Sequence, residues 1–120
     1  MAHILIVEDE KSLSTAYQTI LEAHGHQAII ANDGEEALKI VAKKKPDLIL
    51  LDMKMPRMDG LGFLRGLEGS APELSIIIFS NQDDQSQIDE AFRLGAKRYL
   101  LKSWASPQDL VKVVNEALKA

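Results

Sequence analysis

The sequence predicts an α/β fold in which five short parallel strands form one doubly wound sheet with helices on both faces. Two kinds of segment alternate along the chain: short runs that are apolar at nearly every position, and longer stretches with helical spacing of apolar residues. Runs of the first kind are typical of strands covered on both faces. The length of 120 residues matches one domain. We therefore expect a single domain over residues 1–120, built as β-α-β-α-β-α-β-α-β-α.

The five expected strands are rich in Ile, Val and Leu. Branched side chains favour the extended backbone, where they pack against neighbouring strands. Because most runs lack the alternation of a half-exposed strand, we expect them inside a parallel sheet. In chain order the strands are Ile4 to Val7, Gln27 to Ala31, Leu48 to Leu51, Ile76 to Phe79 and Arg98 to Leu101.

The helices between the strands are indicated by their end signals. Gly25 and Gly95 stand where the first and fourth helices should stop, because glycine readily adopts the left-handed backbone of a helix end. Asp33-Gly34 opens the second helix, which ends in three lysines before Pro46. Ser106-Pro107 is an N-cap with proline at the first helical position of the last helix. The clearest apolar stripes run from Leu13 to Leu21, from Ile88 to Phe92 and from Leu110 to Leu118.

The alternation of strands and helices also restricts the topology. Crossover connections between parallel strands are right-handed, which leaves few arrangements. For five strands the flavodoxin-like order 2-1-3-4-5 is the natural one. In this order strands 1 and 3 are neighbours, and open α/β sheets bind ligands at the carboxyl ends of such strands. The residues that follow each strand are therefore the candidate functional residues.

Composition excludes several classes of protein. The chain has no cysteine, so it has neither a disulfide framework nor a thiolate site. This suits a reducing compartment, and we expect a cytoplasmic protein. The net charge of −4 argues against a direct nucleic-acid partner, because a phosphate backbone attracts basic surfaces. No apolar stretch approaches the length of a membrane span, so we expect no membrane association.

Polar residues follow four of the expected strands, and the topology should bring them together. A single aspartate after a strand is usually a helix cap or turn residue. Three acids at one place, however, repel one another unless a cation is present, and oxygen ligands at a crevice suit Mg²⁺. A carboxylate can also be the nucleophile that takes up a phosphoryl group, with a lysine neutralising its oxygens. The residues are Glu8 and Asp9 after strand 1, Asp52 after strand 3, Ser80 after strand 4 and Lys102 after strand 5.

With these motifs, the chain resembles the receiver domain of bacterial two-component response regulators, of the chemotaxis-regulator type, along its whole length. The combination of motifs in this order is specific, although each one alone is not. The motifs are Glu8-Asp9, the run LDMKMPRMDG over residues 51–60, Ser80, Leu94-Gly95-Ala96 and Lys102.

The resemblance implies that Asp52 is the phosphoacceptor and that the domain needs Mg²⁺. Asp9 and Asp52 would bind the metal directly, with Glu8 acting through water. The backbone carbonyl of Lys54 would supply a further ligand. The phosphodonor would be a histidine kinase or a phosphotransfer protein, and the output protein or domain cannot be named. We expect a signalling domain and not an enzyme.

The resemblance also implies which residues respond to the phosphate. Lys102 and Ser80 would hold phosphoryl oxygens, assisted by the backbone amides of Lys54 and Asn81. On phosphorylation Ser80 would move toward the phosphate and Tyr99 would turn inward. These movements would remodel an interaction surface on helix 4, strand 5 and helix 5.

The sequence departs from the family pattern at three places. Ser103 stands where the family usually has proline after the lysine, and Asn81 where a smaller residue is commoner. Lys97-Arg98 replaces acids that join a dimer-forming network in one large subfamily. We therefore do not expect that dimer mode, although a homodimer of another kind stays an alternative. Ser103 and Asn81 leave open the alternative of a phosphorylation-independent, receiver-like binding module.

Two other readings fit the residues less well. A phosphate-cofactor binder such as a flavodoxin needs a loop rich in Ser, Thr or Gly after the first strand. That loop is acidic here, at Glu8-Asp9-Glu10. A phosphohydrolase with an aspartate nucleophile usually has a second Asp two residues later, where this chain has Lys54.

Overall fold

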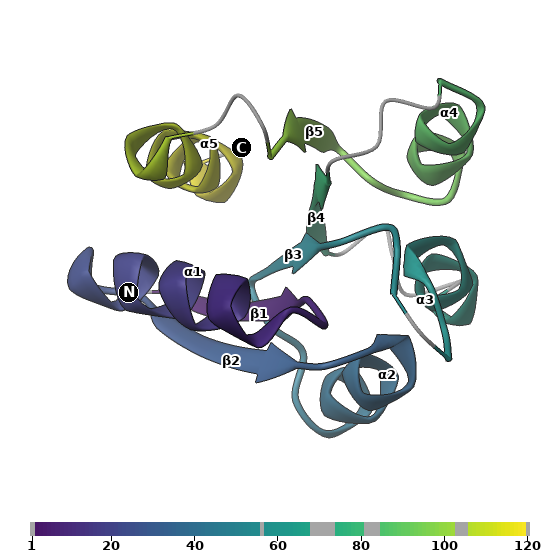
Figure 1. Ribbon diagram of the computed structural model, residues 1–120, viewed down its shortest axis with the longest axis horizontal. Coiled ribbons are helices and arrows are strands. Elements are labelled where there is room, and N and C mark those ends of the chain that lie inside the picture. Colours follow the sequence, from purple (N-terminus) through teal and green to yellow (C-terminus); the bar gives the residue numbers. More distant parts are fainter. Residues whose placement is uncertain (1, 56, 68–73, 81–84, 103–105, 120) are drawn as a thin grey trace.

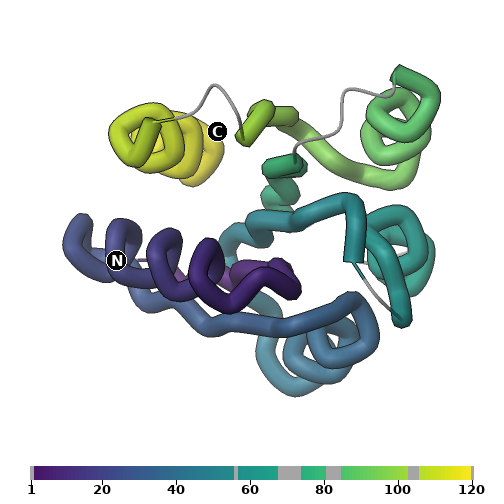
Figure 2. The backbone as a smooth tube through the Cα atoms, viewed as in Figure 1, coloured from purple at the N-terminus to yellow at the C-terminus, as the bar shows by residue number. Residues whose placement is uncertain are grey.

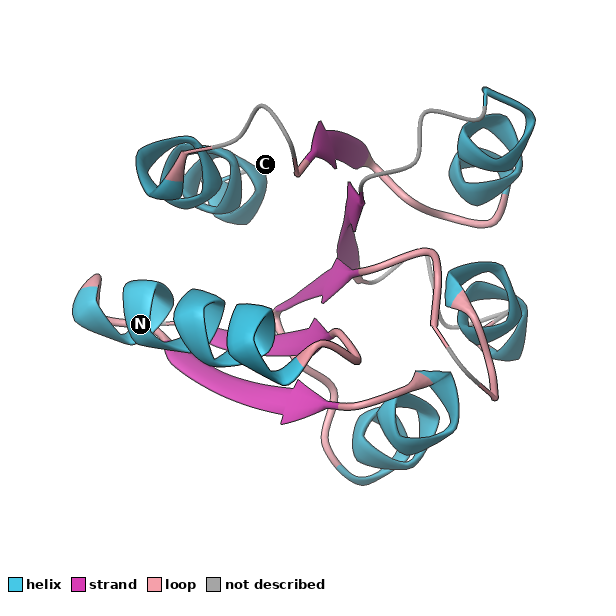
Figure 3. Ribbon diagram, in the orientation of Figure 1, coloured by secondary structure: helices cyan, strands magenta, loops and turns pink. Residues whose placement is uncertain are grey.

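The computed structural model describes residues 2–55, 57–67, 74–80, 85–102 and 106–119. The strands are β1 (His3–Val7), β2 (Gln27–Ala31), β3 (Leu48–Leu51), β4 (Ser75–Ser80) and β5 (Arg98–Leu101). The helices are α1 (Lys11–Ala23), α2 (Gly34–Lys43), α3 (Gly60–Gly66), α4 (Gln85–Arg93) and α5 (Pro107–Lys119). Figure 1 shows three layers: α1 and α5 lie on one face of the sheet, and α2, α3 and α4 lie on the other. Figure 3 shows the same arrangement with the strands in magenta between the two helical layers.

The sheet confirms the predicted topology. Its strand order is β2-β1-β3-β4-β5, and every neighbouring pair is parallel. The predicted strand boundaries agree to within one residue. The difference that matters is at Ser80, which is the last residue of β4 and not the residue after it. The amide of Lys102 donates a hydrogen bond to the Ser80 carbonyl oxygen at 2.9 Å, which extends the ladder between β4 and β5.

Alternate residues of the central strands face opposite helical layers, as the pleat of a strand requires. In β1, Leu5 and Val7 join the core cluster beneath α2, α3 and α4, whereas Ile4 and Ile6 join the cluster beneath α1 and α5. β3 divides in the same way. All four β3 residues are buried. Burial on both faces explains the uninterrupted apolar runs, and it holds the polar strand ends on a rigid frame.

The predicted helix ends are also confirmed. Gly25 and Gly95 have φ angles of 89° and 123°, in the left-handed region that favours glycine. Asp33 caps α2, accepting a hydrogen bond from the Glu36 amide at 2.9 Å. At the start of α5, the Asp109 amide donates to the Ser106 hydroxyl at 3.1 Å.

Helices from opposite ends of the chain lie side by side. Figure 2 traces the chain from purple to yellow and shows α1 and α5 together on one face, and these two helices are in contact. Within the described part of the chain, no helix combines the length and apolar character needed to cross a bilayer.

Candidate functional site

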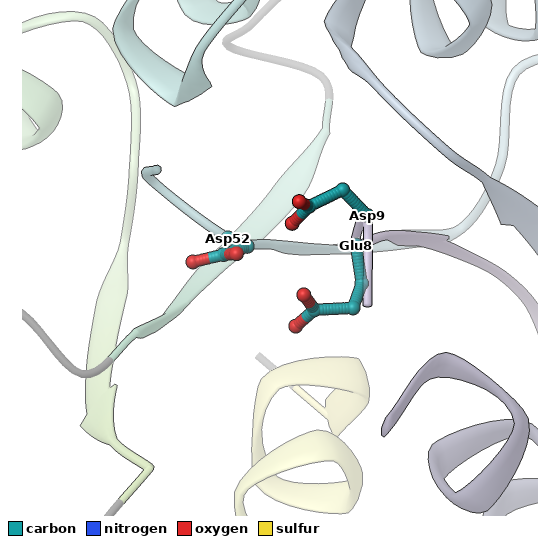
Figure 4. Close-up of side chains that lie close together, drawn as sticks. All are labelled: Glu8, Asp9 and Asp52. Carbon is teal, nitrogen blue, oxygen red and sulfur yellow. The ribbon is translucent and has the colours of Figure 1, made fainter. Parts of the chain in front are cut away.

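The carboxyl ends of β1 and β3 bring three acidic side chains together. The Asp52 amide donates to the Val7 carbonyl oxygen at 3.0 Å, which continues the pairing of these strands past their ends. Glu8, Asp9 and Asp52 each offer an oxygen ligand, and these atoms lie within 4.8 Å of one another. Figure 4 shows the three side chains gathered from the two neighbouring strands. The predicted cluster of acids is therefore present.

A polar pocket of about 220 Å³ opens at this cluster. Glu8 and Asp52 lie deep, with 3% and 7% of their surface exposed, whereas Asp9 is exposed. Ser80, 1% exposed, lies at the end of β4. The pocket is thus acidic and partly shielded from solvent. Charges within it interact more strongly than charges at the surface, because the local dielectric constant is lower. Its lining includes the predicted residues Glu8, Asp9, Asp52, Lys54, Ser80 and Lys102.

Lys102 is the cation that faces the buried carboxylates. Its Nζ donates a hydrogen bond to Glu8 Oε1 and lies 3.6 Å from Asp52 Oδ2. Only 9% of the lysine side chain is exposed. The amide of Lys54 donates to the other oxygen of Asp52, with its nitrogen 3.4 Å from Asp52 Oδ1. Lys102 therefore has a carboxylate partner when no phosphate is present, which the sequence did not predict.

Burial raises the pKa of Glu8 to about 7. Loss of hydration is the largest cause, because it disfavours the charged carboxylate. The hydrogen bond from Lys102 acts in the opposite direction, and the negative charge of Asp52 adds to the rise. The same acidic cluster contributes to a pKa of about 12 for Tyr17, although burial is again the larger cause. The lining of the pocket also contains more acidic side chains (Glu8, Asp9, Glu10 and Asp52) than basic ones (Lys54 and Lys102).

The residues fit a bound Mg²⁺. All three converging ligand groups are carboxylates, the hard oxygen donors that Mg²⁺ prefers. Burial raises the pKa of Glu8 by disfavouring the charged carboxylate, and nearby positive charge opposes that rise. A divalent cation would supply that charge and hold the carboxylates ionised.

Local contacts join described residues of the loop between Asp52 and α3. The Gly60 amide donates to the Met53 carbonyl oxygen at 2.9 Å, and the Asp59 side chain caps α3 through the Gly62 amide at 2.9 Å. A Cβ atom on Gly60 would lie only 2.8 Å from Met53 Cα, so this turn requires glycine. The loop therefore fixes the backbone directly after Asp52.

Sequence reasoning missed an ion pair that joins this loop to α2. Arg57, with φ of 63°, donates from its Nε to Asp33 Oδ2 at 2.9 Å and also from Nη2. The motif Asp33-Gly34 indicated only a helix start. A basic residue inside the loop was the available signal, but its partner lies 24 positions away in the chain.

Other predicted residues lie outside the pocket or outside the described residues. Tyr99 lies in β5, is half-buried and packs against the core cluster on the side of α2, α3 and α4. Asn81 and Ser103 lie outside the described residues.

Comparison with known families and curated proteins gives one consistent result. The family model for the response regulator receiver domain matches residues 4–115 of this chain. Response regulator MprA of Mycobacterium leprae is 34% identical over 110 residues, which are 92% of this chain and 48% of that protein. The alkaline phosphatase synthesis transcriptional regulatory protein PhoP of Bacillus subtilis is 38% identical over 98% of this chain and 47% of its own length. The chain spans about half the length of these relatives.

Solved structures agree with this result. Chemotaxis protein CheY4 of Vibrio cholerae superposes with a TM-score of 0.89, 27% identity and coverage of 98% of both chains. A CheY-like receiver domain protein of Methanospirillum hungatei gives a TM-score of 0.94 at 27% identity, covering 99% of this chain and 94% of its own. A receiver domain protein of Clostridium thermocellum gives 0.89 at 30% identity, with 99% and 95% covered.

Proposed function

The chain belongs to the response regulator receiver family of two-component signalling, and from this premise we propose that it is a phosphorylation switch in which Asp52 is the phosphoacceptor. The observation that carries the proposal is the convergence of three carboxylates and Lys102 at adjoining strand ends. An oxygen of the Asp52 carboxylate attacks phosphorus and forms a new O–P bond. The bond from phosphorus to the donor breaks, and its electron pair leaves with the donor group. The natural donor is a histidine kinase or a phosphotransfer protein.

Asp52 has the surroundings that such a nucleophile needs. It is buried, so the charges around it interact more strongly than they would in bulk water. Lys102 Nζ, 3.6 Å from its carboxylate, is near enough to neutralise a phosphoryl oxygen. The Ser80 hydroxyl and the Lys54 amide would donate hydrogen bonds to the other oxygens, as would the Asn81 amide.

Asp9, Asp52 and the Lys54 carbonyl would hold Mg²⁺, with Glu8 acting through water. When bound, the metal supplies charge neutralisation for the transferring phosphoryl group. Lys102 is shared between Glu8 and Asp52. A metal that stabilises the Glu8 carboxylate would leave Lys102 available for the phosphate.

The switch would act on the surface formed by α4, β5 and α5. Ser80 and Tyr99 lie on neighbouring strands, where Ile78 is paired with Tyr99 and Ser80 with Leu101. A Ser80 hydroxyl drawn toward the phosphate would change the space beside Tyr99. The response is a population shift between two packings, biased by the new phosphate contacts.

The test is the intact mass of the protein after incubation with acetyl phosphate, with and without Mg²⁺. We expect a Mg²⁺-dependent gain of one phosphoryl group that Asp52→Ala abolishes. Asp89→Ala is the matched control, because Asp89 is an aspartate on α4 bonded to Gln85 at the surface. Full uptake by Asp52→Ala would refute the acceptor assignment. Failure of the wild type with both acetyl phosphate and phosphoramidate would favour the phosphorylation-independent binding module.

A further inference from the structure

Three hydrogen bonds join the loop that follows Asp52 to the start of α2, although the two segments are far apart in the sequence. The Gly34 amide donates to the Met58 carbonyl oxygen at 3.1 Å. A Cβ atom on Gly34 would lie 2.8 Å from both Met58 Cγ and Met58 O, so the two segments touch without room for a side chain. Arg57 adds two hydrogen bonds to the Asp33 carboxylate.

Asp33 is buried at this junction between the loop and α2. It is 2% exposed, and its two oxygens have separate functions: Oδ1 accepts from the Glu36 amide and caps α2, while Oδ2 accepts from Arg57. The Glu36 amide and then the Arg57 guanidinium keep the pKa of Asp33 below its ordinary value. The carboxylate is therefore charged at neutral pH and provides a fixed anchor for the guanidinium.

Arg57 adopts a backbone conformation that is unfavourable for a residue other than glycine. Its φ of 63° makes it the one non-glycine residue with positive φ among those described. Residues other than glycine adopt this region at an energetic cost, and they do so where surrounding contacts hold them. Two donors of the planar guanidinium, Nε and Nη2, reach the same oxygen, Asp33 Oδ2, in a geometry that the ammonium group of a lysine does not reproduce.

We propose that Arg57 and Asp33 form a clamp that positions the loop after Asp52 for metal binding. The inference rests on the proposed function, because it assigns the clamp a role at the proposed Mg²⁺ site. Arg57 touches neither the metal nor the phosphate in this assignment, so it is a positioning residue. It anchors the middle of the segment whose beginning includes Asp52 and Lys54.

The clamp and simple electrostatics predict opposite results for one substitution. Arg57→Ala makes the net charge of the protein one unit more negative, which by itself favours a bound cation. Loss of the clamp instead loosens the loop and weakens Mg²⁺ binding. Outer contacts of a metal site typically contribute about 10- to 100-fold to affinity, and for a contact made through a loop we expect about three- to tenfold.

The experiment is Mg²⁺ titration of the whole chain, followed by isothermal calorimetry, for wild type, Arg57→Ala, Arg57→Lys and Arg57→Gly. We expect Arg57→Ala to bind about three- to tenfold more weakly, with Arg57→Lys between it and wild type. Arg57→Gly suits the positive φ, so an affinity as low as that of Arg57→Ala would show that the lost clamp is responsible and not backbone strain. Arg65→Ala is the matched control, because Arg65 is an exposed arginine of α3 with Nη2 3.8 Å from Glu90. Unchanged or tighter binding by Arg57→Ala would overturn the proposal.

A metal-free measurement separates failure of the clamp from failure of the proposed function. Hydrogen exchange of the Gly34 amide reports directly on its bond to Met58. We expect this amide to exchange at least about threefold faster in Arg57→Ala than in wild type, because local opening becomes easier. Equal exchange rates would overturn the clamp whatever the metal does. A wild type that bound no Mg²⁺ would refute the metal site of the proposed function, and with it the role of the clamp there.

Discussion

Glu8 should make the stability of the metal-free protein depend on pH. Its pKa is raised in the folded protein from an ordinary value of 4.5 to about 7. A carboxyl with a raised folded-state pKa binds its proton more tightly when folded than when unfolded. The free energy of unfolding therefore falls as pH rises from about 4.5 to about 7. Below this window the group imposes no cost, and above it the full cost of a buried carboxylate is present.

The size of the effect follows from the shift. Each pKa unit corresponds to about 1.4 kcal/mol, so the folded protein should lose about 3 kcal/mol across the window through Glu8 alone. This is a large part of the stability of a small domain, which is about 5–15 kcal/mol. Saturating Mg²⁺ should reduce the loss, because a bound cation stabilises the ionised carboxylates of Glu8, Asp9 and Asp52.

The assay is chemical unfolding at a series of pH values between about 4.5 and 8, for wild type and Glu8→Gln, each with and without Mg²⁺. Glutamine keeps the shape of the side chain and cannot ionise, so the decline should disappear in Glu8→Gln. Glu22→Gln is a matched control, since Glu22 is an exposed glutamate of α1. An equal decline in wild type and Glu8→Gln would refute the reasoning, because the pH dependence would then come from other groups.

Two further predictions concern the frame around the site. Gly60→Ala should cost about 1–3 kcal/mol in unfolding experiments and slow phosphorylation, because its Cβ would meet backbone atoms at 2.8 Å (Met53 Cα) and 2.9 Å (Asp52 O). Gly66→Ala is the control from the same helix, where the atoms nearest to the Cβ belong to the Leu38 side chain and not to the backbone. Equal costs would contradict the steric argument. Ile49→Ala, at a residue with no exposed surface, should lose about 2–5 kcal/mol in denaturant unfolding. Ile29→Ala, at a residue that is 54% exposed, should lose less than about 1 kcal/mol, and a larger loss would show that Ile29 packs more tightly than described.

Much of the fold could be predicted because the signals are local. Each strand was indicated by its own apolar run, and several helix ends by a glycine, proline or capping residue near them. The strand order then followed from general rules of handedness, and the sheet has this order. Placing Glu8, Asp9 and Asp52 together required only that β1 and β3 be neighbours, as they are.

The roles of individual residues around the acids were less accessible. The sequence predicted that Lys102 binds a phosphoryl oxygen. In the folded protein its ammonium group donates a hydrogen bond to Glu8. The motif at Asp33 indicated a cap, and only one of its two oxygens has that function. The sequence shows the charged residues but not which of them pair, because the partners lie 94 and 24 positions apart.

The sequence by itself determined the (βα)₅ order, the burial of the central strands and the set of polar residues at the strand ends. These depend on hydrophobic period and backbone preference, which act within a few residues. Only the tertiary structure decided which carboxylate Lys102 contacts, how far the pKa of Glu8 rises and that Arg57 reaches Asp33. Those properties depend on desolvation and on distances between side chains from separate segments, and neither exists until the segments pack together.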